Sequence, residues 1–297
     1  MIAAKAPQPT TKVNFDVPRH ACDCHTHMFG DPKQFPFSPT RSYTPELALP
    51  AEMLAVHRAL HIERVVVVTP SVYGTDNSAT LHAIKALGRT ARGVAVIDDR
   101  ITDRDLDALA RAGIRGVRIN VATAGPTDPA AVRRRFEATA GRLKGRNWHI
   151  QIYTNAAAIP AIKDAVLDSP LPVVFDHFGG AQAALGITQP GFTELIELVR
   201  SGKAYVKISG AYRASTRAPG YPDVAPLAKA LIAANQDRIL WGTDWPHPDS
   251  SRRPAGEIAP FLPIDDGYLL NELPLWAPDA ALRETILVRN PARLYEF

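Results

Sequence analysis

Short apolar runs recur along the chain, and stretches with the period of an amphipathic helix separate them. Continuous apolar strands that alternate with helices are typical of a parallel sheet buried on both faces. Eight such units favour a closed barrel over an open sheet. We therefore predict the α/β class and a single (β/α)8 TIM barrel. The predicted strands are His20–Cys24, Arg64–Thr69, Gly93–Ile97, Gly116–Asn120, His149–Tyr153, Pro172–Asp176, Ala204–Ile208 and Arg238–Trp241.

The segments between the strands have helical periodicity, and a last helix is expected near Pro278–Val288. Two connections are unusually long, Phe29–Pro50 after the first strand and Ser209–Asp223 after the seventh. Loops of this length in a compact domain are usually functional. The other predicted helices are Glu52–Leu60, Asn77–Leu87, Asp103–Ala112, Ala130–Leu143, Ala157–Leu167, Phe192–Val199 and Val224–Ala234.

The start of the chain differs in composition from the rest. Residues 1–19 are polar and contain proline, so we expect a flexible leader, followed by one barrel domain over residues 20–297. Met1–Val17 has no apolar signal-peptide core, and the chain has no run of 18 apolar residues. These features predict a cytoplasmic protein that does not bind a membrane.

A formal net charge of +4 mildly favours an anionic ligand. The longest basic run, Arg133-Arg134-Arg135, lies beside Glu137 in a predicted helix. No aromatic stacking platform accompanies it, so a solvated helix face is favoured over a nucleic-acid site. The expected partner is therefore a small anionic substrate, and no pattern indicates an oligomeric state.

Chemically active side chains gather where the predicted strands end. His25 and His27 follow the first strand, His177 follows the sixth, and Asp244 lies just beyond the eighth. The active sites of barrel enzymes form at the C-terminal ends of the strands. Three histidines and one carboxylate in these places predict a catalytic site.

The His-x-His pair and the late aspartate resemble the pattern of the amidohydrolase superfamily. That family commonly adds a lysine or glutamate on strand 4 and a histidine on strand 5. This chain instead has Arg118-Ile119-Asn120 at the end of strand 4 and Tyr153 on strand 5. We therefore favour catalysis without a metal cofactor. Because three protein ligands suffice for a catalytic zinc ion, the alternative of one divalent ion on His25, His27 and Asp244 stays open.

A narrower resemblance, to the 2-pyrone-4,6-dicarboxylate lactonase-like family, covers nearly the whole chain. It implies a carboxylic ester hydrolase that opens a lactone ring without a bound metal, in the catabolism of an aromatic or sugar acid. The matching segments are Gln34–Pro39 with Tyr43, Tyr73–Asn77, Arg115–Arg118, Asp176–Gly179, Trp241–Pro248 and Asn290–Tyr295.

The same resemblance implies a role for each matching residue. Asp244 corresponds to the general base that activates water. His25, His27 and His177 correspond to the groups that polarise the lactone carbonyl and stabilise the oxyanion, a task for which imidazole N–H groups are suited. Arg118 and Arg213 correspond to clamps for substrate carboxylates, because guanidinium binds carboxylate with two parallel hydrogen bonds. The remaining pocket residues implied are Tyr43, Ser71, Tyr153 and His247.

One departure leaves the substrate open. The family resemblance predicts another arginine about six residues beyond Arg118, where this chain reads Val121-Ala122-Thr123-Ala124-Gly125. The substrate can therefore be a dicarboxylate pyrone, a monoacid, a sulfonated muconolactone-type compound or a sugar-acid lactone. A metal-dependent hydrolase or decarboxylase of the same superfamily is the alternative. A non-catalytic binder of small acids is disfavoured, because it would have no use for a general base.

Overall fold

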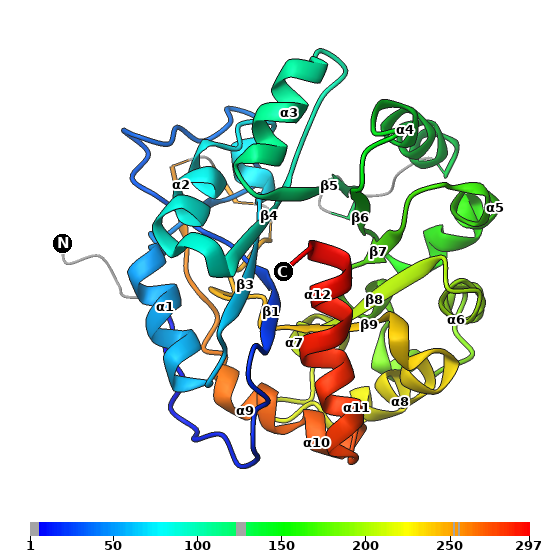
Figure 1. Ribbon diagram of the computed structural model, residues 1–297. Helices are drawn as coiled ribbons and strands as arrows, with labels where there is room; N and C mark the ends of the chain where they lie inside the picture. The colour runs from blue at the N-terminus through cyan, green and yellow to red at the C-terminus, as the bar shows by residue number, and fades with distance from the viewer. Residues whose placement is uncertain (1–5, 123–128, 252, 255) are drawn as a thin grey trace. The chain divides into compact units, whose positions relative to one another are not determined.

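The computed structural model describes residues 6–122, 129–251, 253–254 and 256–297. Residues 1–5 of the expected leader and residues 123–125, where the missing arginine was expected, lie outside the described residues. The chain forms two compact units (Figure 1). Unit 1 comprises Met1–Arg115 and Thr243–Asn271, and unit 2 comprises Gly116–Gly242 and Glu272–Phe297.

Unit 1 is built on three parallel strands in the order β1-β3-β4. The central strand, β3, presents four consecutive buried valines, Val65–Val68, so both of its faces are covered. Helices α1 and α2 pack beside each other, and α2 also contacts β3 and β4. The elements are β1 (Cys22–Thr26), α1 (Pro50–Ala59), β3 (Arg64–Val68), η1 (Ser71–Tyr73), α2 (Ser78–Leu87), η2 (Gly88–Thr90), β4 (Ala91–Ala95) and α3 (Asp103–Arg111).

The long connection after β1 is fixed by hydrogen bonds within unit 1. Phe29 and Ala48 exchange backbone hydrogen bonds that close the loop. Its strand β2 (Thr44–Pro45) pairs with β10 (Ile258–Ala259), which precedes α9 (Asp266–Asn271). The Tyr73 hydroxyl accepts the Gly30 N–H at 2.9 Å, and burial raises the pKa of Tyr73 to about 12. This tyrosine therefore remains neutral while it anchors the loop.

The described part of the expected leader is also held in unit 1. The Ala6 N–H donates to Glu52, and the indole Nε1 of Trp245 donates to the Pro7 carbonyl at 2.8 Å. Thr11 donates to the Asp265 carboxylate through both its backbone N–H and its hydroxyl. From Ala6 onward this segment thus contributes hydrogen bonds to the unit.

Unit 2 is built on parallel strands in the order β5-β6-β7-β8-β9. Its strands are β5 (Ile114–Asn120), whose first two residues belong to unit 1, β6 (His149–Tyr153), β7 (Val173–Phe175), β8 (Ala204–Ser209) and β9 (Ile239–Gly242). Its helices are α4 (Pro129–Arg142), η3 (Ala156–Ile162), α5 (Lys163–Asp168), η4 (His177–Gly180), η5 (Ala183–Leu185), α6 (Phe192–Arg200), α7 (Ala211–Ala214), η6 (Pro222–Val224), α8 (Ala225–Ala234), η7 (Gln236–Arg238), α10 (Leu273–Trp276), α11 (Ala280–Glu284), η8 (Thr285–Arg289) and α12 (Asn290–Tyr295).

All eight predicted strands are present, with ends that shift by up to two residues. The predicted helix Ala157–Leu167 is different, because it divides into η3 and α5. Pro160 lies inside η3 and has no backbone N–H to donate, which disfavours a continuous α-helix there. The two-residue strands β2 and β10 were not predicted.

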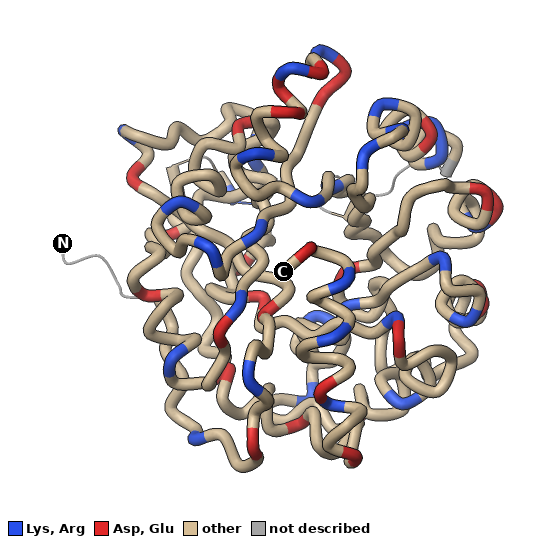
Figure 2. The backbone as a smooth tube through the Cα atoms, in the orientation of Figure 1, with Lys and Arg blue, Asp and Glu red and all other residues tan. Residues whose placement is uncertain are grey.

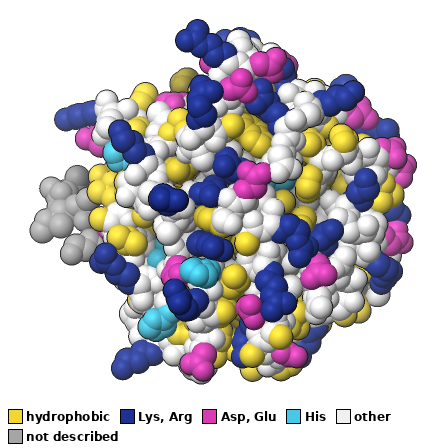
Figure 3. All heavy atoms as spheres, viewed as in Figure 1, with side chains coloured by type: hydrophobic (Ala, Val, Ile, Leu, Met, Phe, Trp, Pro, Cys, Tyr) yellow, Lys and Arg dark blue, Asp and Glu magenta, His cyan; other side chains and the backbone are white. Residues whose placement is uncertain are grey.

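Charged side chains of both signs alternate on the outer helices. In Figure 2, α3 carries Lys or Arg and Asp or Glu in close succession, and the exposed Arg133 on α4 forms an ion pair with Glu137 at 2.8 Å. On the face drawn in Figure 3, basic and acidic side chains are interspersed. The Arg133-Glu137 pair is an ordinary feature of a solvated helix. Among the described residues, no helix has the length and apolar character needed to cross a membrane.

Candidate active site

Two histidines and an aspartate are brought together in unit 1 by parallel backbone pairing. The Asp244 N–H donates to the His25 carbonyl at 2.9 Å, and the His27 N–H donates to the Trp245 carbonyl at 2.9 Å. These two backbone hydrogen bonds therefore hold the segment after β9 beside the end of β1. His25 and His27 stand two residues apart on an extended chain, so their side chains point to the same side.

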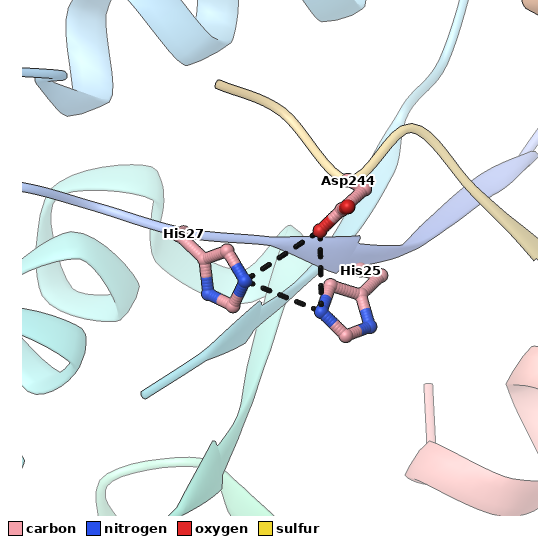
Figure 4. Close-up of side chains that lie close together, drawn as sticks. All are labelled: His25, His27 and Asp244. Carbon is pink, nitrogen blue, oxygen red and sulfur yellow. Dashed lines mark hydrogen bonds and ion pairs between the residues drawn. The ribbon is translucent and has the colours of Figure 1, made fainter. Parts of the chain in front are cut away.

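The three side chains form a small triangle of ligand atoms (Figure 4). The Nε2 atoms of His25 and His27 are 3.3 Å apart, and each lies 3.6 Å from Asp244 Oδ1. The His25 and Asp244 side chains are fully buried, whereas 7% of the His27 side chain is exposed. Electrostatic interactions are stronger in such a water-poor environment than at the surface.

The tautomer of His27 follows from its second contact. Its Nδ1 lies 2.8 Å from the Val68 carbonyl oxygen, which can only accept, so Nδ1 carries a proton. In neutral His27, Nε2 therefore presents a lone pair to the triangle. A hydrogen bond between the two Nε2 atoms then requires His25 to be the donor. His27 can donate from Nε2 only when its imidazole is protonated.

The triangle also fits a single divalent ion. A tetrahedral ion with bonds of about 2.0–2.2 Å separates its ligand atoms by about 3.3–3.6 Å. The observed separations of 3.3, 3.6 and 3.6 Å lie in this range. A backbone carbonyl that accepts from Nδ1, as Val68 does for His27, is a common way to orient a metal-ligating histidine. His25, His27 and Asp244 can therefore hold the ion that was left open as an alternative.

A buried carboxylate behind the triangle connects both segments. Asp23 Oδ1 accepts the backbone N–H groups of His25 and Thr243, both at 3.0 Å. Its Oδ2 accepts the Thr243 hydroxyl at 2.6 Å and faces His57 Nε2 at 3.2 Å. The Thr243 hydroxyl in turn accepts the Trp245 N–H at 3.0 Å. Asp23 thus fixes the backbone on either side of the triangle.

Asp244 itself adopts an uncommon backbone conformation, with φ of 69°. A non-glycine residue in the left-handed region costs of order 1–3 kcal/mol, and such residues cluster at functional sites. Asp244 is held there by its hydrogen bond to His25, by the Asp23–Thr243 contacts, and by the His247 N–H that donates to its carbonyl at 3.1 Å.

We expect Thr243→Val to lower kcat about tenfold and to lower the free energy of unfolding by about 1–3 kcal/mol, because it leaves the Asp23 carboxylate and the Trp245 N–H each short of one buried partner. KM should change little, since Thr243 supports the backbone of Asp244. Steady-state kinetics and urea unfolding measure both effects. Thr243→Ser retains the hydroxyl and should stay near the wild type; an equal loss in Thr243→Ser would show that the hydrogen bonds of the hydroxyl do not account for the effect.

The other predicted pocket residues of unit 1 differ in environment. His247 is fully buried, and its Nε2 lies 3.1 Å from the Asp266 carboxylate. Burial raises the pKa of Asp266, and His247 opposes this increase. Tyr43 is buried in the long loop, and Ser71 is half-buried as the first residue of η1.

In unit 2, three predicted site residues lie together. His177 follows β7 with φ of 47°, its Nδ1 is 3.0 Å from Ser209 Oγ, and its ring packs edge-on to Tyr153 at 5.3 Å. The Arg118 guanidinium lies over the same Tyr153 ring, with its central carbon 5.2 Å from the ring centre. Arg118 is only 5% exposed.

Arg213 lies on α7, which packs against η4, the turn that begins with His177. Its guanidinium carbon is 5.0 Å from the ring centre of Tyr212. Gly210, which precedes the helix, has φ of 59° and allows the chain to turn sharply after β8. Arg213 is half-buried.

Sequence reasoning missed two groups of buried polar residues. One is Asp23 with His57 and Thr243 in unit 1. The other is Lys207, Asp176 and Gln151 in unit 2, which contact one another beside Arg118. A signal was available, because Asp23 and Lys207 are charged residues whose neighbours on both sides in the strand are apolar. Charged residues are rarely buried unless they are paired.

Comparison with known proteins identifies relatives of this chain. Residues 22–297 match the amidohydrolase family. The chain is 36% identical to 2-pyrone-4,6-dicarboxylate hydrolase of Comamonas testosteroni, over 96% of this chain and 93% of the relative. It is also 36% identical to 4-sulfomuconolactone hydrolase of Rhizobium radiobacter, over 95% and 92%.

A crystal structure of an Agrobacterium tumefaciens protein is similar over 97% of this chain and 98% of its own, with a TM-score of 0.80 and 26% identity. This similarity, with eight parallel strands and intervening helices, confirms the predicted TIM-barrel fold.

Proposed function

This chain belongs to the amidohydrolase family, and we propose that it hydrolyses the ester ring of a small carboxylated or sulfonated lactone. The observation that carries the proposal is the buried Asp244 carboxylate, which lies 3.6 Å from two imidazole nitrogens at the ends of barrel strands. Two relatives of similar length support the reaction class, since both hydrolyse acidic lactones by name.

In the proposed reaction, Asp244 removes a proton from water, and the water oxygen bonds to the lactone carbonyl carbon. The negative charge that develops on the carbonyl oxygen is met by N–H groups of His25, His27 and His177. The ring C–O bond then breaks, and the proton held by Asp244 passes to the leaving oxygen. Without a metal, this scheme requires His27 to be protonated, because its Nδ1 already donates to Val68.

The acid group of the substrate is assigned to Arg118 and Arg213, with Tyr153 beside the first. A carboxylate and a sulfonate both present oxygen pairs to a guanidinium fork. The places in the substrate pocket expected of Tyr43, Ser71 and His247 remain predictions. The names of the two relatives support a substrate with a carboxylate or a sulfonate.

A second candidate is hydrolysis assisted by one divalent ion on His25, His27 and Asp244. The observation in its favour is the triangle of 3.3–3.6 Å between three potential ligand atoms, one of them a lone pair in neutral His27. An ion there would supply a Lewis acid for the carbonyl and acidify a water. In that case Asp244 and both histidines act as ligands, and His177 remains available to the substrate.

The test is turnover of 2-pyrone-4,6-dicarboxylate, 4-sulfomuconolactone and a sugar-acid lactone, before and after prolonged treatment with a strong chelator. We expect the protein to hydrolyse at least one of these substrates after chelator treatment. Elemental analysis of the treated protein should find less than one equivalent of metal per chain. Activity that disappears and returns with zinc or manganese would establish the second candidate. No turnover of any acidic lactone in either state would contradict the proposed function.

A further inference from the structure

The most unusual residue of unit 2 is a fully buried lysine in the middle of a strand. Lys207 lies on β8, and its Nζ is 3.2 Å from Asp176 Oδ1. The same Nζ donates to Gln151 Oε1 at 2.7 Å. Burying an ammonium group costs several kcal/mol unless it is paired and hydrogen-bonded. Packing of the strand alone therefore does not explain why a lysine occupies this position.

The three side chains close a ring of contacts. Gln151 Nε2 donates to Asp176 Oδ2 at 2.9 Å, so one amide connects the cation to the anion. The amide orientation is fixed, because lysine can only donate and an ionised carboxylate can only accept. The ring consequently holds Asp176 through both of its oxygens.

Arg118 is attached to this ring by a weaker contact. Its Nε lies 3.4 Å from Asp176 Oδ2, the oxygen that already accepts from Gln151. Strong guanidinium–carboxylate hydrogen bonds are about 2.7–2.9 Å long and are frequently bidentate. The observed contact engages one edge of the guanidinium, while its flat face lies over Tyr153. Asp176 thus orients Arg118 without a short bidentate pair between them.

We propose that Lys207 is a positioning residue, whose pairing with Asp176 keeps Arg118 available for the acid group of the substrate. The inference rests on the part of the proposed function that assigns an acid group to Arg118. The formal charges of Lys207, Arg118 and Asp176 sum to +1, and an anionic ligand neutralises this excess. Lys207 itself touches no reacting atom in this scheme.

Loss of the ammonium changes the competition for Asp176. In Lys207→Met, a carboxylate formerly shared by two cations faces Arg118, which can rotate into a bidentate pair. Substrate must then break that pair before it binds. Binding of a carboxylated ligand should weaken by about 10–100-fold, whereas kcat at saturation should change by less than about threefold.

A rescue variant, compared on charged and uncharged ligands, tests this role. Lys207→Met with Asp176→Asn removes the competing carboxylate as well, so Arg118 becomes available again. Binding in the double variant should return to within about threefold of the wild type, although one more buried charge has been removed. Because Asp176→Asn also removes the unpaired buried charge that Lys207→Met leaves, a purely structural role would change the binding of an uncharged analogue as much as that of the acid.

The experiment is calorimetric titration with pyridine-2,4-dicarboxylate, a planar diacid that cannot be hydrolysed, and with its uncharged dimethyl ester. Wild type, Lys207→Met, Asp176→Asn and the double variant are compared. Lys203→Met is the matched control, because it removes the same charge from an exposed side chain that donates to the Ser169 carbonyl. If Lys207→Met does not fold, Lys207→Gln, which keeps a hydrogen-bond donor without the charge, is used in its place.

The expected result is weaker diacid binding in Lys207→Met, recovery in the double variant, and no change with the dimethyl ester or in Lys203→Met. Equal loss in the single and double variants, or no wild-type binding of the diacid, overturns the role given to Lys207. The pattern in binding can hold even if no lactone is hydrolysed, in which case the proposed function fails alone. Lactone turnover with unchanged binding in Lys207→Met rejects this inference alone.

Discussion

Asp244→Asn should lower kcat for the best lactone by about 10³–10⁴-fold, because general acid–base catalysis contributes roughly 10²–10⁴ and the amide cannot take a proton from water. KM should stay within a few-fold of the wild type. The substitution conserves volume at a fully buried site, and the amide can donate to neutral His27 or accept from protonated His27. The fold should therefore survive.

Steady-state kinetics with a thermal unfolding curve checks this expectation. Asp249→Asn is the matched control: it removes a carboxylate from the same segment, where it pairs with Arg253 and not with the histidines. Metal content of both variants separates the two candidate mechanisms, since a metal-dependent enzyme would lose its ion with Asp244 and a metal-free one has none to lose. An Asp244→Asn enzyme within tenfold of the wild type would show that another group is the base.

The strands could be predicted because most are short runs made up largely of apolar residues, as a parallel sheet covered on both faces requires. Their ends were less certain. Gly93–Ile97 was expected where β4 runs from Ala91 to Ala95, because the apolar run Val94–Ile97 continues past the last ladder contact. Hydrogen bonds to β3 decide where β4 stops, and these bonds depend on residues distant in sequence.

The candidate site could be predicted as a set of strand-end residues but not as a network. His25, His27 and Asp244 were found because barrel chemistry gathers at C-terminal strand ends, and their convergence is observed. Asp23 and Lys207 lie inside their strands: Asp23 is two residues before His25 in β1, and Lys207 is two residues before the end of β8. Their partners, Thr243 and Asp176, directly follow the strands β9 and β7, so the pairing that makes each burial acceptable is visible only in three dimensions.

The tautomer of His27 also could not be predicted from the sequence. The sequence predicted imidazole N–H groups directed at a lactone carbonyl. The Val68 carbonyl, contributed by β3, uses the proton of neutral His27 on the opposite side of the ring. The chemistry of the triangle is therefore set by a backbone atom that no motif contains. This is why the metal-free and metal-assisted mechanisms differ in the charge of His27, and why chelation distinguishes them.

Arg118→Met should lower kcat/KM for a carboxylated lactone by about 10²–10³-fold, because loss of a buried charged partner costs roughly 2–5 kcal/mol of binding. The effect should lie mainly in KM, since the acid group that Arg118 is proposed to bind is remote from the ester carbonyl. Arg118→Lys keeps the charge but lacks the planar fork, so it should recover only part of the loss.

The substrate itself provides the control for this prediction. The methyl ester of the same lactone has no carboxylate for the fork, so wild type and Arg118→Met should hydrolyse it at rates within about threefold of each other. Equal losses on acid and ester would mean that Arg118 acts through packing over Tyr153 and not through the substrate charge. A loss confined to the acid identifies the guanidinium as the group that selects anionic lactones.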